Sequence, residues 1–170
     1  MTLRLVPSDD PVLRQPAKPV DDPSSVRELA RELTKMLVTE GGVGLAAPQV
    51  GQGLRLFVTG VDDRNHIFIN PEITWKSDKE IWWEEGCLSL PRLYGEVRRP
   101  KQVTVRYTDE HGAAQELKAD GLLARVIQHE HDHLEGILFP DRMQDLSTLR
   151  KVSEEEWQSR FRRDEGERPE

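Results

Sequence analysis

The residues best suited to chemistry are His129, Glu130 and His133, which form the pattern HExxH. Residues four apart lie about one turn apart on one face of a helix, so both imidazoles could bind a single metal ion. In this pattern the glutamate is not a ligand, and it can accept a proton from a water molecule that the metal activates. A short pattern also arises by chance in charged helices, so other residues must decide whether a metal site exists.

A buried helix is expected to carry these residues. Asp120 stands where an N-cap residue would, and Gly136 stands where a left-handed residue often follows a helix, so the helix should span about 121–135. Apolar residues occur nearly all around its first half, which indicates contacts on several sides. The two histidines are therefore expected inside the protein.

A catalytic metal site with two histidines still needs a third protein ligand. In the pattern HExxHxxGxxH a third histidine would fall at Phe139, which cannot bind a metal. In another class of enzyme the third ligand is a glutamate farther along the chain from the second histidine, and the glutamates at 154–156 stand at a suitable distance. However, Ser153 and Glu156 form a capping box, so these glutamates are better explained as the start of a C-terminal helix. Cys87, the only cysteine, follows a glycine in EEGCLSLP and is either a thiolate ligand or a buried apolar residue.

A stretch of small residues, GGVGLAAPQVGQG at 41–53, would let the backbone pass close to a ligand. It contains neither a phosphate-loop lysine nor the pattern GxGxxG, so we do not expect it to bind a nucleotide. Gln49 is the only long polar residue at its centre, and it either faces a ligand or is solvated in a flexible turn.

The composition excludes several classes of protein. The 170 residues carry a formal net charge of −7, with a pI near 5.3, so the chain lacks the cationic surface expected for a nucleic-acid or anionic-membrane partner. No apolar run approaches the length of a membrane span, and the first residues lack the apolar core of a secretory signal. A lone cysteine excludes an internal disulfide, so we expect a cytoplasmic protein.

The order of the elements predicts an α+β fold, in which strands pack around the buried central helix that carries HExxH, plus a C-terminal helix. Residues 1–146 should form the catalytic domain, and 147–170 the C-terminal helix and tail of the same domain. Trp75, Trp82 and Trp83 are expected to pack in the core and across strands. The elements expected before the central helix are a helix that begins after Asp22 and ends by Gly41, two strands within 54–71, extended segments within 73–91, and a hairpin around 109–112.

Three motifs, GVGLAAPQVG, EGCLSLP and QHEHDHLEG, occur in this order, and with them the sequence strongly resembles the peptide deformylases. These enzymes remove the formyl group from the initiating methionine of new polypeptides. The similarity extends over residues 10–142. The resemblance implies that Cys87, His129 and His133 bind one divalent metal ion and that Glu130 is the general base. Members of the family typically use Fe2+ and often accept Ni2+, Co2+ or Zn2+.

The same resemblance implies that Gln49 and the backbone N–H of Leu88 stabilise the oxyanion that forms during hydrolysis. The methionine side chain needs an apolar slot beside the metal. Related bacterial sequences often carry a basic residue near the groove, where this chain offers Arg92 and Tyr94. The residues expected to line the methionine slot are Val43, Gly44, Leu122 and Val126.

The expected partners are N-formylmethionyl nascent peptides, with a transient ribosome contact and a monomeric enzyme. In some family members a C-terminal helix docks on the ribosome, but here Arg160, Arg162 and Arg163 are offset by acidic residues at 154–156 and 164–167. So mixed a pattern does not itself predict ribosome binding. Two alternatives are a metallopeptidase, which would need the glutamates at 154–156 as ligands, and a non-catalytic binding protein, which would usually lack the glutamate of HExxH or Gln49.

Overall fold

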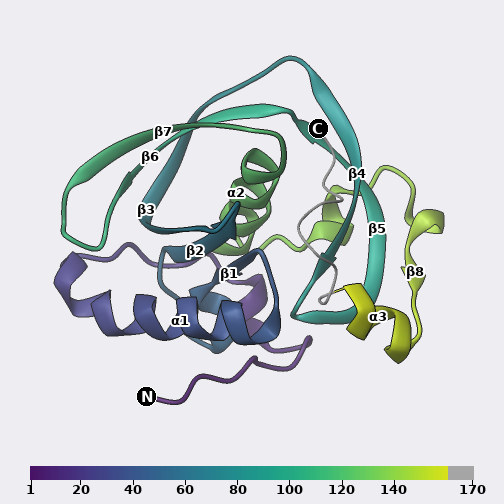
Figure 1. Ribbon diagram of the computed structural model, residues 1–170, viewed down its shortest axis with the longest axis horizontal. Coiled ribbons are helices and arrows are strands. Elements are labelled where there is room, and N and C mark those ends of the chain that lie inside the picture. The colour runs from purple at the N-terminus through teal and green to yellow at the C-terminus, as the bar shows by residue number, and fades with distance from the viewer. Residues whose placement is uncertain (161–170) are drawn as a thin grey trace.

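The computed structural model describes residues 1–160, which form two antiparallel sheets on either side of a central helix (Figure 1). The first sheet contains, in spatial order, β1 (Gly44–Ala46), β2 (Leu56–Val61), β3 (Arg64–Lys76), β6 (Gln102–Thr108) and β7 (Ala114–Asp120). The second contains β4 (Glu80–Cys87), β5 (Leu90–Pro100) and β8 (Arg150–Lys151). The α-helices are α1 (Arg27–Glu40), α2 (Gly121–Leu134) and α3 (Glu154–Arg160). This arrangement confirms the predicted α+β fold.

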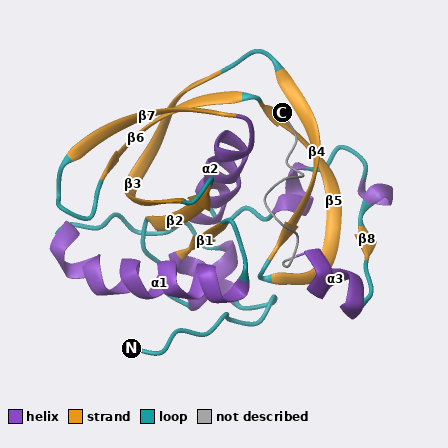
Figure 2. Ribbon diagram, in the orientation of Figure 1, coloured by secondary structure: helices purple, strands orange, loops and turns teal. Residues whose placement is uncertain are grey.

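The central helix is α2, which lies between the two sheets (Figure 2). Its apolar residues Ala124, Ile127 and Leu134 pack into a buried cluster with aromatic and aliphatic residues of the first sheet. Asp120 occupies the N-cap position as predicted, although its side chain makes no capping hydrogen bond. Gly136 has a φ of 73°, and a Cβ at this position would lie 2.6 Å from the Arg14 carbonyl oxygen, so the N-terminal arm could not pass.

Helix α1 lies against β1 and β2 of the first sheet (Figure 1). The prediction that a helix begins after Asp22 needs one correction: Asp22 caps a 3₁₀ turn at Pro23–Val26, and the α-helix begins at Arg27. The helix ends before Gly41, whose φ of 68° closes it as predicted. Its buried leucines pack on both strands and so fix β1, which lies within the small-residue stretch 41–53.

The three tryptophans are not core residues, so that part of the expectation was wrong, whereas Trp82 does pack across strands, against its β5 partner Arg98. Trp75, Trp82 and Trp83 are 52%, 49% and 36% exposed. The end of β3 extends beyond the buried part of the first sheet, and Trp82 on β4 lies under the Arg98 guanidinium, 5.9 Å from its ring centroid. An alternating pattern gives a strand two faces, but it does not say which face another layer covers.

The predicted C-terminal helix is present as α3, and it lies beside β5 (Figure 1). Ser153 Oγ accepts a hydrogen bond from the Glu156 N–H at 3.0 Å, as its predicted capping position requires. The predicted tail beyond Arg160, which includes Arg162 and Arg163, lies outside the described residues. Among the helices described, none is long and apolar enough to cross a membrane.

Candidate active site

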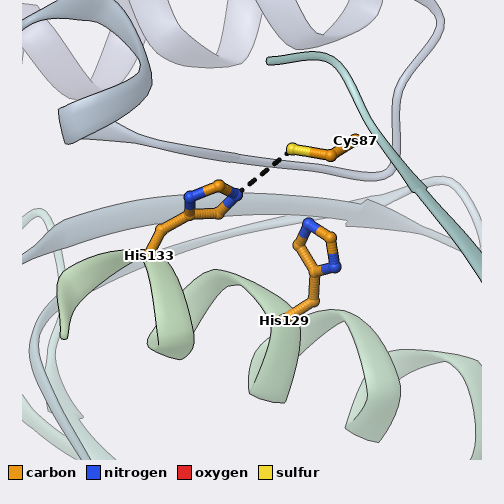
Figure 3. Close-up of side chains that lie close together, drawn as sticks. All are labelled: Cys87, His129 and His133. Carbon is orange, nitrogen blue, oxygen red and sulfur yellow. Dashed lines mark hydrogen bonds between the residues drawn. The ribbon is translucent and has the colours of Figure 1, made fainter. Parts of the chain in front are cut away.

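Cys87, His129 and His133 come together between the two sheets, although forty-odd residues separate the cysteine from the histidines. Helix α2 presents both imidazoles on one face, and the end of β4 brings the thiol toward them (Figure 3). One donor atom from each residue lies within 4.8 Å of the other two, and Cys87 Sγ is 3.4 Å from His133 Nε2. A thiolate and two imidazoles are a common donor set for zinc and other late divalent metals, so these residues fit a metal ion.

The three side chains were each identified from the sequence, and the structure brings all of them together. Burial, and then the nearby His129, hold the pKa of His133 well below its usual value, which keeps this imidazole neutral and able to bind a metal. The glutamates of α3 are not part of the cluster: Glu156 pairs with Arg160 at 2.8 Å, and Glu154 accepts a hydrogen bond from Gln158. Among the described residues, the metallopeptidase alternative therefore lacks the glutamate ligand that it needs.

Glu130 lies beside the three metal-ligand residues, and one oxygen of its buried carboxylate lacks a hydrogen-bond partner within residues 1–160. The residue is 4% exposed, and its Oε2 atom has no hydrogen-bond partner among the described residues. Leaving a buried carboxylate oxygen unpaired costs free energy unless a ligand satisfies it. Burial raises the pKa of Glu130 to about 7, which suits a group that exchanges protons near neutral pH.

A buried chain of charges supports His129 from behind. Its Nδ1 lies 2.9 Å from Glu85 Oε1, which leaves the other ring nitrogen to bind a metal. Arg99 and Arg125 both donate to Glu85, at 2.6 Å and 2.5 Å. Although burial opposes ionisation, the hydrogen bonds from His129 and Arg99 hold the pKa of Glu85 well below its usual range, so it remains a carboxylate.

The same chain continues to the surface through Asp132. Arg99 donates to Asp132 at 2.9 Å, and Arg142 donates to its other carboxylate oxygen at 2.9 Å. These supporting residues were not predicted from the sequence. One signal was available, because Arg125 stands four residues before His129 and so shares its face of the helix.

Gln49 is buried, 1% exposed, which excludes a solvated turn. Its Oε1 accepts a hydrogen bond from the Ala46 N–H at 2.8 Å, and this bond directs the amide nitrogen toward the cluster. Gln49 Nε2 lies 3.5 Å from Cys87 Sγ and 3.0 Å from Ser89 Oγ. Leu88 lies between Cys87 and Ser89 in the turn that follows β4. Both Gln49 and Leu88 line the cavity beside the metal ligands.

This cavity has a volume of about 170 Å³ and opens between two walls. One wall comes from residues 42–44, and the other from β4 and β5, where Trp83, Glu84 and Tyr94 line it. Helix α2 forms the floor. The predicted slot residues Val43, Gly44, Leu122 and Val126 all lie in its lining.

A buried metal-ligand cluster, an unpaired carboxylate and an amide donor, facing one cavity in an α+β fold, define the class of protein as a metal-dependent hydrolase. The model of the polypeptide deformylase family matches residues 2–148. A peptide deformylase from Treponema pallidum (strain Nichols) is 47% identical over 135 residues, which cover 79% of this chain and 83% of that protein. A peptide deformylase from Synechococcus sp. (strain CC9605) is 47% identical over 86% of this chain and 76% of its own.

Solved structures agree with the sequence relatives. The crystal structure of peptide deformylase from Thermotoga maritima superposes with a TM-score of 0.82, at 39% identity, and covers 85% of this chain and 99% of that one. The chain belongs to the polypeptide deformylase family. Its activity is peptide deformylation, the hydrolytic removal of N-formyl groups from newly made polypeptides, which confirms the function predicted from the motifs.

Proposed function

We propose that Glu130 is the general base of this deformylation and that Cys87, His129 and His133 hold the metal. The observation that carries the proposal is the buried, unpaired Glu130 carboxylate beside three converging donor atoms. A divalent ion held there would polarise the formyl carbonyl and make a water molecule more acidic. Glu130 would take the proton of that water as it attacks the formyl carbon, and would then pass the proton to the leaving amine.

Gln49 and Leu88 are proposed to stabilise the oxyanion. The carbonyl oxygen of the formyl group gains negative charge as the water attacks, and fixed N–H donors lower the energy of that charge. The Gln49 side chain is already fixed by its bond to the Ala46 N–H, so its amide nitrogen loses little freedom when it binds the oxyanion. The Leu88 backbone N–H is the second proposed donor, from the turn that follows Cys87.

The methionine side chain is proposed to enter the part of the cavity that α2 lines. Leu122 and Val126 are seven and three residues before His129, so they lie along its helix face toward the N-terminus. Val43 and Gly44 face them from the opposite wall of the cavity. The formyl group is attached to the backbone nitrogen of this methionine. A side chain bound in an apolar slot next to the metal would therefore place the formyl group at the reacting centre.

Fe2+ is the metal we propose for the native enzyme, by the family resemblance, with Zn2+, Ni2+ or Co2+ as substitutes. The donor set suits all of these ions, so affinity alone does not select one. Metal analysis of protein purified without oxygen from its own source tests the assignment. A preparation that holds zinc alone and has full activity would contradict it.

We also propose that the enzyme works in the cytoplasm as a monomer and meets nascent N-formylmethionyl peptides during a transient contact with the ribosome. The unpaired Cys87 and the proposed metal thiolate both suit a reducing compartment. Light scattering would test the monomer, and sedimentation with translating ribosomes would test the contact. A stable dimer, or no sedimentation above that of an unrelated protein, would contradict the respective proposal.

The experiment that tests the catalytic assignment compares the wild type with Glu130→Gln, both purified anaerobically and loaded with Fe2+. We expect formate release from formyl-Met-Ala-Ser to fall by about 10²- to 10⁴-fold in the variant, while one metal ion per chain remains bound. Glu40→Gln, the same change on the exposed end of α1, is the matched control and should keep wild-type activity. Near-normal activity in Glu130→Gln would remove Glu130 from the role of base.

A further inference from the structure

Helix α3 contacts the wall of the substrate cavity through Arg160. Its guanidinium carbon lies 4.0 Å from the centroid of the Tyr94 ring, a cation–π contact. Its Nη1 atom donates to Glu84 Oε1 at 2.8 Å. Both Tyr94 and Glu84 line the cavity, so the C-terminal helix contacts two of its lining residues without entering it.

Tyr94 also contacts the segment that carries the metal ligand. The residue is 8% exposed, and its ring lies directly against Gly86, where a Cβ would clash with ring atom Cε1. Gly86 pairs with Tyr94 across β4 and β5 and directly precedes Cys87. A shift of the Tyr94 ring would therefore also change its contact with Gly86, next to the metal ligand Cys87.

Glu84 would otherwise present a negative charge at this wall. Two arginines compensate it: Arg150 donates at 3.1 Å and Arg160 at 2.8 Å. Arg160 is the more enclosed of the two, with 20% of its side chain exposed against 49% for Arg150. Because charge interactions strengthen as water is excluded, removing Arg160 would leave the larger uncompensated charge.

The proposed path of the substrate passes close to the negative charge of Glu84. With the formyl group at the metal ligands and the methionine side chain in the cavity, the residues that follow methionine must leave between the two walls. The walls at that opening are residues 42–44 on one side and Trp83, Glu84 and Tyr94 on the other. The second substrate residue must therefore pass close to the Glu84 carboxylate.

We propose that Arg160 is a positioning residue for substrate specificity: it fixes the Tyr94 ring and compensates Glu84, so that the enzyme accepts an acidic residue after formylmethionine. The inference rests on the proposed use of this cavity by the peptide. In the wild type, peptides with Asp, Ser or Lys after formylmethionine should react with similar kcat/KM. Without Arg160, Glu84 should repel Asp and attract Lys.

The test measures formate release from formyl-Met-Asp-Ser, formyl-Met-Ser-Ser and formyl-Met-Lys-Ser. In Arg160→Met we expect the Lys-over-Asp ratio of kcat/KM to rise about three- to fivefold, the size of an exposed ion pair, and to do so through KM. Adding Glu84→Gln should return the ratio to the wild-type value. A general loss of structure would lower kcat for all three peptides and would not be rescued by that second change.

Two further variants separate charge from ring placement. Arg160→Lys keeps the charge but loses the planar group over Tyr94, so it should keep the ratio and raise KM for all three peptides together. Arg106→Met, the matched control on the first sheet, removes an arginine that pairs with Glu116 and should not change the ratio. Thermal melts of every variant show whether each one folds.

The inference fails if folded Arg160→Met keeps the wild-type ratio, or if Glu84→Gln does not restore it. These outcomes differ from a failure of the proposed catalytic function, in which the wild type would release no formate from any of the three peptides. If Arg160→Met does not fold, an increased Lys-over-Asp ratio in Arg160→Lys would equally contradict the inference.

Discussion

His129 depends on Glu85 more than on any other described residue outside the metal cluster. The Glu85 carboxylate accepts the imidazole N–H from one side and two buried guanidinium groups from the other. Such partners orient the ring and raise its basicity as a ligand. Because both arginines are buried, the carboxylate also compensates two charges that would be costly alone.

Replacing this carboxylate by an amide should therefore weaken both the metal site and the fold. In Glu85→Gln we expect metal affinity to fall about 10- to 100-fold. We also expect the free energy of unfolding to fall by about 3–5 kcal/mol, since buried arginines lose their counter-charge. Competition with a chelator measures the first quantity and urea denaturation the second.

The adjacent Glu84→Gln serves as the control, because Glu84 is partly exposed and pairs with Arg150 and Arg160 rather than with a metal-ligand histidine. It should leave metal affinity unchanged. If Glu85→Gln bound metal as tightly as the wild type, the carboxylate would have no part in orienting His129.

Gln49 makes a separate contribution, which should appear in the rate. Gln49→Ala removes one proposed oxyanion donor, so we expect kcat for formyl-Met-Ala-Ser to fall about 10²- to 10³-fold while the metal remains bound. Steady-state kinetics with metal analysis of the same sample measures the effect. A rise in KM with kcat unchanged would instead assign Gln49 to substrate binding.

The residues that carry a recognisable pattern could be predicted from the sequence, whereas the residues that support them were not. The helical spacing of His129 and His133, and the isolation of Cys87 as the only thiol, could be read directly. The bonds from Glu85 to Arg99 and Arg125 span 14 and 40 residues and depend on how β4 and β5 meet α2. No local sequence pattern predicts how β4 and β5 pack against α2.

At the scale of elements, the site depends on how closely β1 approaches α2. Gly44 lies at the point of contact, where a Cβ would be 2.5 Å from Glu130 Oε1 and 2.7 Å from Val126 Cγ1. Only a residue without a side chain permits this approach. The small residues noted in the sequence thus have a definite use at this position.

Gly44→Ala should displace the Glu130 carboxylate. We expect a loss of about 1–3 kcal/mol in the free energy of unfolding from overpacking, and a fall in kcat as the base moves. Gly53→Ala is the control, because its Cβ would meet only Val12 at 3.9 Å. Urea denaturation and formate release measure the two effects, and wild-type values of both would show that the strand and helix can separate without cost.

Elements with strong local signals were predicted well, and their surroundings less well. Capping residues and glycines located α1 and α2 to within a few residues. The patterns around Trp75 and Trp82 correctly predicted strands, but both side chains are about half exposed, so the prediction that they are buried in the core was wrong. Burial of a strand face depends on a distant layer, which the strand's own residues do not specify.

In the whole molecule, the metal would add a link between the second sheet and the central helix, which buried ion pairs already join. Cys87 belongs to the second sheet, whereas the histidines belong to α2, which packs its apolar face on the first sheet. A bound ion therefore cross-links the sheets through the helix. Anything that binds the folded state alone stabilises it, by about 2.7 kcal/mol when the free ligand is 100 times its Kd.

Removing the metal should therefore lower the thermal stability of the entire chain in one cooperative transition. For a chain of this size, 2.7 kcal/mol corresponds to a Tm shift of about 5–10 °C. Anaerobic calorimetry of the metal-loaded and chelated protein measures the shift, and Cys87→Ala is the variant in which added metal should have little effect. If chelation split the melt into two transitions, the sheets would unfold independently, and the metal would be their main connection. If chelation left the Tm of the wild type unchanged, the ligands would be preformed by the Glu85 network and the ion would contribute chemistry without stabilising the fold.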